Sequence, residues 1–255
     1  MRKKSLPLAL LLLPFVITAQ LSCARRTSTG ANPSSSPSAT EQAEIEKILQ
    51  RYEQAIGGQE ALEALTSYRM KATFHFLGVS GDLEAWRKEP LKTLTVMQLP
   101  RIGTIKKGFD GETRWLQTAA GTVTESGAQE IAELEREADA YSAGKIRAFF
   151  DTLRLENKAW LSGRDVHVIE GKPAKGPAEK LFFDVENGLL LRWDMARRRE
   201  NRTVFVKIHF DDYREVGGVK LPYKLRFAFE QFNFNVQVHE VEHNIPIDDA
   251  IFRKP

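Results

Sequence analysis

The sequence predicts a mainly β domain of the α+β class, built on an antiparallel sheet of about a dozen strands. Large apolar side chains fall on every second residue in many short runs, which is the period of a strand with one buried face. Turn-forming pairs such as Asp110-Gly111 and Asn187-Gly188 separate these runs. Most runs follow one another without the helices that parallel crossovers need, so antiparallel meanders are expected.

The first 22 residues have the character of a signal peptide. Arg2, Lys3 and Lys4 precede an apolar run at 6–17, which is as long as a signal-peptide core and short for a membrane span. The protein is therefore expected to be exported. Without residues 1–22 the basic residues number 37 − 3 = 34, against 34 acidic residues, so the mature chain has no formal net charge. This balance excludes nucleic-acid binding through net charge.

The single cysteine, Cys23, directly follows this segment. One thiol cannot form an intrachain disulfide. The region resembles a bacterial lipoprotein signal, in which such a cysteine is acylated, although Gln20-Leu21-Ser22 places leucine one position later than usual. Ordinary cleavage near Ala19, leaving a free thiol, is the alternative. By the same resemblance, Ala24 favours an anchor in the outer membrane over the inner membrane.

Residues 23–40 are expected to join this anchor to the folded domain. From 27 to 40 there is no large apolar side chain, so the segment cannot bury enough surface to offset its ordering entropy. We interpret it as a disordered tether with a reach of about 20 Å. The folded domain is then predicted to span residues 41–255.

Two helices are expected to open the domain and to cover the sheet. Apolar residues recur at helical spacing from Ile45 to Ile56, and Gly57-Gly58 follows where a helix would stop. Residues 59–65 supply a second, short helix. Strands are then predicted at 68–76, 83–88, 91–99, 102–109, 113–118, 158–161, 165–171, 180–185, 189–195, 203–210, 221–230 and 231–240.

One long helical segment, from about 128 to 155, is predicted to interrupt the strands. In its second part Ile146, Phe149, Phe150 and Leu153 form an apolar stripe. This stripe is expected to be either a structural plug over the sheet or a movable lid.

The string His239-Glu-Val-Glu-His243 matches the zinc-protease motif H-E-x-x-H, which places two histidines on one face of a helix. Here the string continues a strand. At about 3.3 Å per residue the two histidines would share a face but lie about 13 Å apart, too far for one zinc ion. We therefore predict no metal site. The sequence also lacks the G-x-S-x-G, P-loop and G-x-G-x-x-G motifs, so no cofactor and no catalytic residue are predicted. An acid pair assembled from distant strands stays open as the basis of a hydrolase.

Three segments resemble landmarks of outer-membrane lipoprotein-sorting proteins: Gly81–Pro90, Phe109–Trp115 and Ile245–Pro255, the last ending in Phe-x-x-Pro. The order of tether, helix, meander, helical insertion and second meander is also similar. The resemblance implies a LolA/LolB-like half-barrel, in which helices cover the concave face of a curved antiparallel sheet and acyl chains lie between them. The chain departs from soluble carriers at Glu89, where they have a basic residue that latches the lid.

The resemblance also implies a function. The protein is expected to be periplasmic and anchored through lipidated Cys23. It is expected to bind an acyl chain, a lipoprotein lipid or another hydrophobic ligand non-covalently, without catalysing a reaction. Burial of such a chain yields about 0.8 kcal/mol per CH₂. A sensor or scaffold domain that binds a protein partner is the first alternative, and a hydrolase is the second. The candidate cavity residues, each of which could instead be plain core, are Phe74, Phe76, Trp86, Trp115, Phe149, Phe150, Phe183, Trp193, Phe227, Phe229, Phe232 and Phe234.

Overall fold

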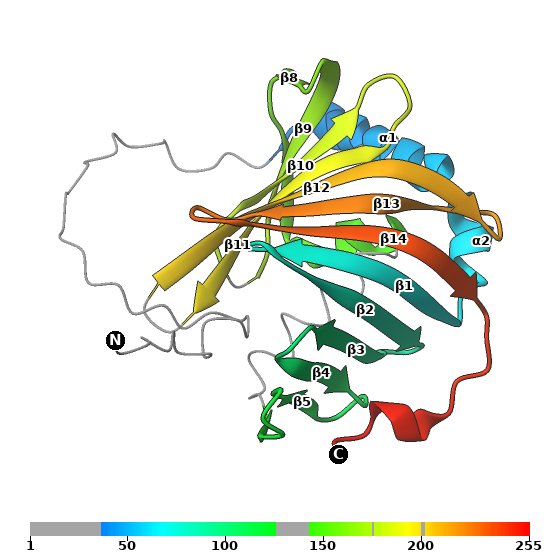
Figure 1. The fold of residues 1–255 in the computed structure, drawn as a ribbon. Helices are drawn as coiled ribbons and strands as arrows, with labels where there is room; N and C mark the ends of the chain where they lie inside the picture. Colours follow the sequence, from blue (N-terminus) through cyan, green and yellow to red (C-terminus); the bar gives the residue numbers. More distant parts are fainter. Residues whose placement is uncertain (1–36, 126–142, 175, 200–201) are drawn as a thin grey trace, which may run out of the picture. The chain divides into compact units, whose positions relative to one another are not determined.

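The described strands all belong to one antiparallel sheet, which forms an open half-barrel (Figure 1). This computed structural model describes residues 37–125, 143–174, 176–199 and 202–255. The predicted signal peptide, Cys23 and most of the tether lie outside this part of the chain. The fold class predicted from the sequence is confirmed.

The sheet contains fourteen strands within the described residues. Four helical segments accompany them in the part of the chain that the structure describes: α1 (Ala39–Ala55), α2 (Gly58–Glu63) and the 3₁₀ turns η2 (Ala143–Phe149) and η3 (Asp249–Phe252). The strands are β1 (Ser67–Phe76), β2 (Val79–Lys88), β3 (Lys92–Leu99), β4 (Gly103–Phe109), β5 (Arg114–Gln117), β6 (Val123–Glu125), β7 (Thr152–Leu155), β8 (Ala159–Leu161), β9 (Arg164–Lys172), β10 (Glu179–Asp184), β11 (Leu190–Arg199), β12 (Arg202–Val216), β13 (Val219–Ala228) and β14 (Asn233–His243).

The strand order is β6-β5-β4-β3-β2-β1-β14-β13-β12-β11-β10-β9-β7, and β8 also pairs with β9. Two meanders therefore meet where the first strand, β1, pairs with the last, β14. At this seam Phe74 lies opposite Val236 and Phe76 opposite Phe234. Figure 1 shows the seam in the middle of the sheet.

One face of the sheet, which we call the inner face, packs against α1 and η2. Ile45, Ile48 and Tyr52 are the buried residues of α1, as their helical spacing predicts. They join Phe183 and Trp193 of β10 and β11 in the largest apolar cluster. The helix begins at Ala39, two residues earlier than expected, because the Ser38 side chain accepts a hydrogen bond from the Glu41 amide at 3.1 Å.

The opposite, outer face is covered at one end by the C-terminal segment. Leu94, Trp115 and Phe252 form a second apolar cluster there, with Trp86 packed against it. The indole Nε1 of Trp115 donates to the Phe252 carbonyl at 2.8 Å. Through these contacts η3 is fixed against the first meander.

The prediction of one helix over 128–155 is wrong at its C-terminal end, and 128–142 lie outside the described residues. A 3₁₀ turn replaces the helix at Ala143–Phe149, and Thr152–Leu155 form strand β7. Leu153 pairs with Gly171 of β9. A Cβ on Gly171 would lie 2.6 Å from the Phe150 ring, so the ring packs closely against the glycine. Pairing with a distant strand therefore outweighs the helical spacing of the stripe.

Candidate functional site

A cavity of about 470 Å³ opens on the inner face, between α2 and one end of strands β1, β2, β13 and β14. Its walls are mostly apolar, and polar groups gather among them. The lining residues are Glu53, Gln59, Leu62, Glu63, Leu65, Thr66, Ser67, Tyr68, Met70, Arg87, Glu89, Leu221, Pro222, Val241 and His243.

The turn between α1 and α2 fixes one wall of this cavity beside β13. Gly57 has a φ of 133°, and a Cβ there would lie 2.4 Å from the Gly218 carbonyl oxygen, so only glycine fits. Next to it, the Lys220 amide donates to the Ile56 carbonyl at 2.9 Å. Leu62 on α2 and Leu221 on β13 therefore face the same space.

A buried cation lies in the cavity wall and is neutralised within it. Arg87 is only 5% exposed, and its guanidinium forms an ion pair with Glu89 at 3.0 Å. Tyr68 lies opposite Arg87 in the β1–β2 register. Burial raises the pKa of Tyr68, and the nearby Arg87 offsets only part of this effect. The phenol is thus neutral at pH 7, and the Arg87–Glu89 pair carries no net charge.

The two histidines of the H-E-x-x-H string lie on a strand, but on opposite faces of the sheet. A β-bulge between Lys71 and Ala72 of β1 leaves His239 unpaired in the register. His239 is exposed and forms a hydrogen bond with Thr73 at 2.7 Å, whereas His243 lies opposite Tyr68 and lines the cavity. The expectation that they share a face is therefore wrong, because the extra residue reverses the alternation. Within the described residues no group of three His, Cys, Asp or Glu could hold a metal.

The sequence did not indicate that His243, unlike His239, lines the cavity. Within the described chain neither of its buried ring nitrogens has a hydrogen bond of normal geometry. Burial lowers the pKa of His243, and the backbone of Val216 offsets part of this effect. The ring is therefore uncharged at pH 7.

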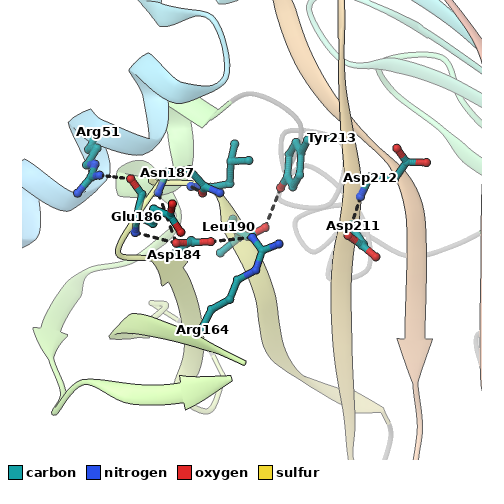
Figure 2. Close-up of polar contacts among 10 residues, drawn as sticks. Arg51, Arg164, Asp184, Glu186, Asn187, Leu190, Asp211, Asp212 and Tyr213 are labelled. Carbon is teal, nitrogen blue, oxygen red and sulfur yellow. Dashed lines mark hydrogen bonds and ion pairs between the residues drawn. The ribbon is translucent and has the colours of Figure 1, made fainter. Parts of the chain in front are cut away.

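The carboxylate of Asp184, the most buried aspartate in the described part, serves the fold (Figure 2). Burial alone would raise its pKa, but hydrogen bonds from Arg164 at 2.8 Å and from the amides of Glu186 and Asn187 outweigh this and lower the pKa. Arg51 of α1 donates to the Glu186 carbonyl of the same turn. The network ties α1 to the β10–β11 turn. A carboxylate held ionised in this way does not match the general acid that a hydrolase needs.

The structure places ten of the twelve candidate aromatic residues on the inner-face side. Phe149, Phe150, Phe183, Trp193, Phe227 and Phe229 belong to the cluster under α1. Phe74, Phe76, Phe232 and Phe234 contact one another across the β1–β14 seam and its turn, with ring centroids 5.0–6.2 Å apart. Phe227 joins the two groups through Phe234.

Trp86 and Trp115 instead lie on the outer face, under the C-terminal segment. None of the twelve lines the cavity described above. As ligand contacts they stay predictions, and their burial is that of core residues.

A scan against models of protein families finds no match to this chain, and a search of curated proteins finds none either. Solved structures do match. A DUF1329 family protein from Desulfovibrio piger has a TM-score of 0.58 at 14% identity, over 82% of this chain and 97% of that one. This chain has the same fold.

Two further structures share this fold, and one of them, a LolA superfamily protein, shows that it is LolA-like. A domain assigned as an outer membrane lipoprotein-sorting protein, from Vibrio parahaemolyticus, has a TM-score of 0.57 at 12% identity, covering 81% of this chain and 96% of that one. A LolA superfamily protein from Nitrosomonas europaea has a TM-score of 0.56 at 10% identity, covering 82% and 97%. At such identities the likeness extends to the fold, and it confirms the resemblance predicted from the sequence.

Proposed function

We propose that this protein is an exported, non-enzymatic binding protein that holds an acyl chain, a lipoprotein lipid or another hydrophobic ligand in the cavity beside α2. The cavity itself carries the proposal. Its volume of about 470 Å³ falls among those of ligand pockets, roughly 300–1,000 Å³. Leu62, Met70, Leu221 and Val241 supply apolar walls. Each methylene buried against them contributes about 0.8 kcal/mol. A chain of several methylenes therefore offsets the entropy cost of association.

We also propose that Cys23 is acylated and anchors the domain in the periplasm, with the outer membrane favoured. Within the described residues no helix has both the length and the apolar character needed to cross a membrane. Intact-mass analysis of the mature protein and cell fractionation of Cys23→Ala test the anchor. Acylation predicts a lipid mass adduct and release of the variant from membranes. An unmodified thiol with unchanged fractionation would contradict it.

Ligand binding is tested with a substitution that fills the cavity. Leu221→Trp should weaken binding of an uncharged fluorescent fatty-alcohol probe by at least about tenfold, since the indole would occupy space that the chain needs. Leu77→Trp is the matched control, because Leu77 is 63% exposed and lies outside the cavity. Native mass spectrometry of the purified protein adds a search for copurified lipid.

If no lipid copurifies and Leu221→Trp binds the probe as tightly as the unmodified protein, the cavity is not the binding site. The scaffold alternative, with a protein partner, would then be preferred.

A further inference from the structure

The rim of the cavity carries more negative than positive charge. Among the described residues that line the cavity, Glu53, Glu63 and Glu89 supply three carboxylates, against the single guanidinium of Arg87. Arg87 and Glu89 neutralise each other at 3.0 Å. The uncompensated charges are therefore those of Glu53 and Glu63.

These two carboxylates come from different helices, Glu53 from α1 and Glu63 from α2. Within the described residues neither forms an ion pair with a lysine or arginine. Glu63 accepts only a hydrogen bond from Gln59, at 2.7 Å. Both line the cavity, and Glu53 is half-buried and Glu63 exposed, so solvent reaches both carboxylates.

An amphiphile whose chain enters the apolar interior leaves its head group at this rim. A carboxylate or phosphate head would be repelled there by Glu53 and Glu63, and the guanidinium of Arg87 already pairs with Glu89. A protonated amine would instead be attracted to the carboxylates of Glu53 and Glu63, neither of which is paired with a described lysine or arginine. Each exposed ion pair typically changes affinity by up to about fivefold.

We propose that the ligand is a single-chain amphiphile whose head group carries a cationic amine, held at the rim by Glu53 and Glu63. This inference rests on the proposed function and adds to it the class of head group. The selectivity comes from the rim, whereas the apolar walls provide the shared affinity for any chain.

The test compares dodecylamine, dodecanol and dodecanoate, which share one chain and differ in head-group charge. Each displaces the uncharged fatty-alcohol probe from the full mature protein at pH 7. Dodecylamine should bind about five- to twentyfold more tightly than dodecanol, and dodecanoate more weakly than either. The preference for the amine should shrink at about 0.5 M salt, because exposed charges are screened.

The double variant Glu53→Gln and Glu63→Gln should bind dodecylamine no more tightly than dodecanol. The matched control is Glu60→Gln with Glu186→Gln, which removes the same charge from exposed positions outside the cavity lining. This control should keep the amine preference. The salt dependence of the unmodified protein gives the same information without any substitution.

The outcomes separate the two proposals. Binding of dodecanol together with equal or weaker binding of dodecylamine would overturn the head-group inference and leave the binding function standing. Tightest binding of dodecanoate would also overturn it, and would assign the head group to Arg87. Failure of all three compounds to displace or bind would overturn the binding function itself.

Discussion

Truncation of Trp193 separates a core residue from a ligand contact. This side chain is 2% exposed, and its Nε1 donates to the Glu179 carboxylate at 2.9 Å. Its ring stacks on Phe149 with centroids 6.2 Å apart. Removing a buried tryptophan costs about 3–5 kcal/mol, and loss of one hydrogen bond to a buried acceptor adds about 1–3 kcal/mol. Trp193→Ala should therefore lower the free energy of unfolding by about 4–8 kcal/mol.

For a domain of this size the expected fall in Tm is about 8–32 °C, to be measured by circular dichroism. Trp160→Ala is the matched control, because Trp160 is 71% exposed and its removal should change stability by less than about 0.5 kcal/mol. Below the Tm, binding of the fatty-alcohol probe should be unchanged in both variants. A Trp193→Ala protein that melts near the normal temperature but no longer binds the probe would refute this reasoning and make Trp193 a ligand contact.

Two other substitutions probe the first meander. Gly108→Ala should lower the free energy of unfolding by about 1–3 kcal/mol in chemical denaturation, since its Cβ would lie 2.3 Å from the Trp115 ring. If the same substitution lowers the stability of a Trp115→Ala protein by as much, a clash with this ring is not the cause. Hydrogen bonds from Lys88 and Lys92 lower the pKa of Asp249 to about 2, from an ordinary 3.8. The stability that this adds is present above about pH 4 and lost as the pH falls toward about 2. Asp249→Asn should therefore be less stable at pH 7, and a gap that persists unchanged at pH 2 would argue against the pair.

Local patterns in the sequence predict most of the fold. Alternation and turn pairs locate the strands, and the spacing from Ile45 to Ile56 locates α1, because each pattern reflects which side of an element is buried. The same rule misleads at Leu153, which fits both a helical stripe and an alternating strand. Its pairing with Gly171 decides the outcome, and a local pattern carries no information on a partner that distant.

The cavity could not be predicted in the same way. Its walls come from α1, α2 and four strands, and the sequence does not mark which ends of these elements converge. Aromatic residues are the obvious candidates for a lipid site, but rings such as Phe183 and Trp193 fill the core beneath α1. The face of the sheet on which His243 lies, relative to the residues before it, depends on a β-bulge at His239. The residue types around this bulge do not predict it. One signal was present: Arg87 is a charge that alternation places on the buried face.

The seam between β1 and β14 has a consequence for how the protein folds. There the Thr66 amide donates to the Asn244 side chain, joining residues 178 positions apart. Each meander can form from neighbouring strands, whereas the seam must close a loop of almost the whole domain. Such non-local pairing slows folding, since the entropy of loop closure is lost before the contacts form. Until β14 has docked, β1 and β13 both present unpaired backbone edges that invite aggregation, so the interval before this pairing is when the chain most needs protection.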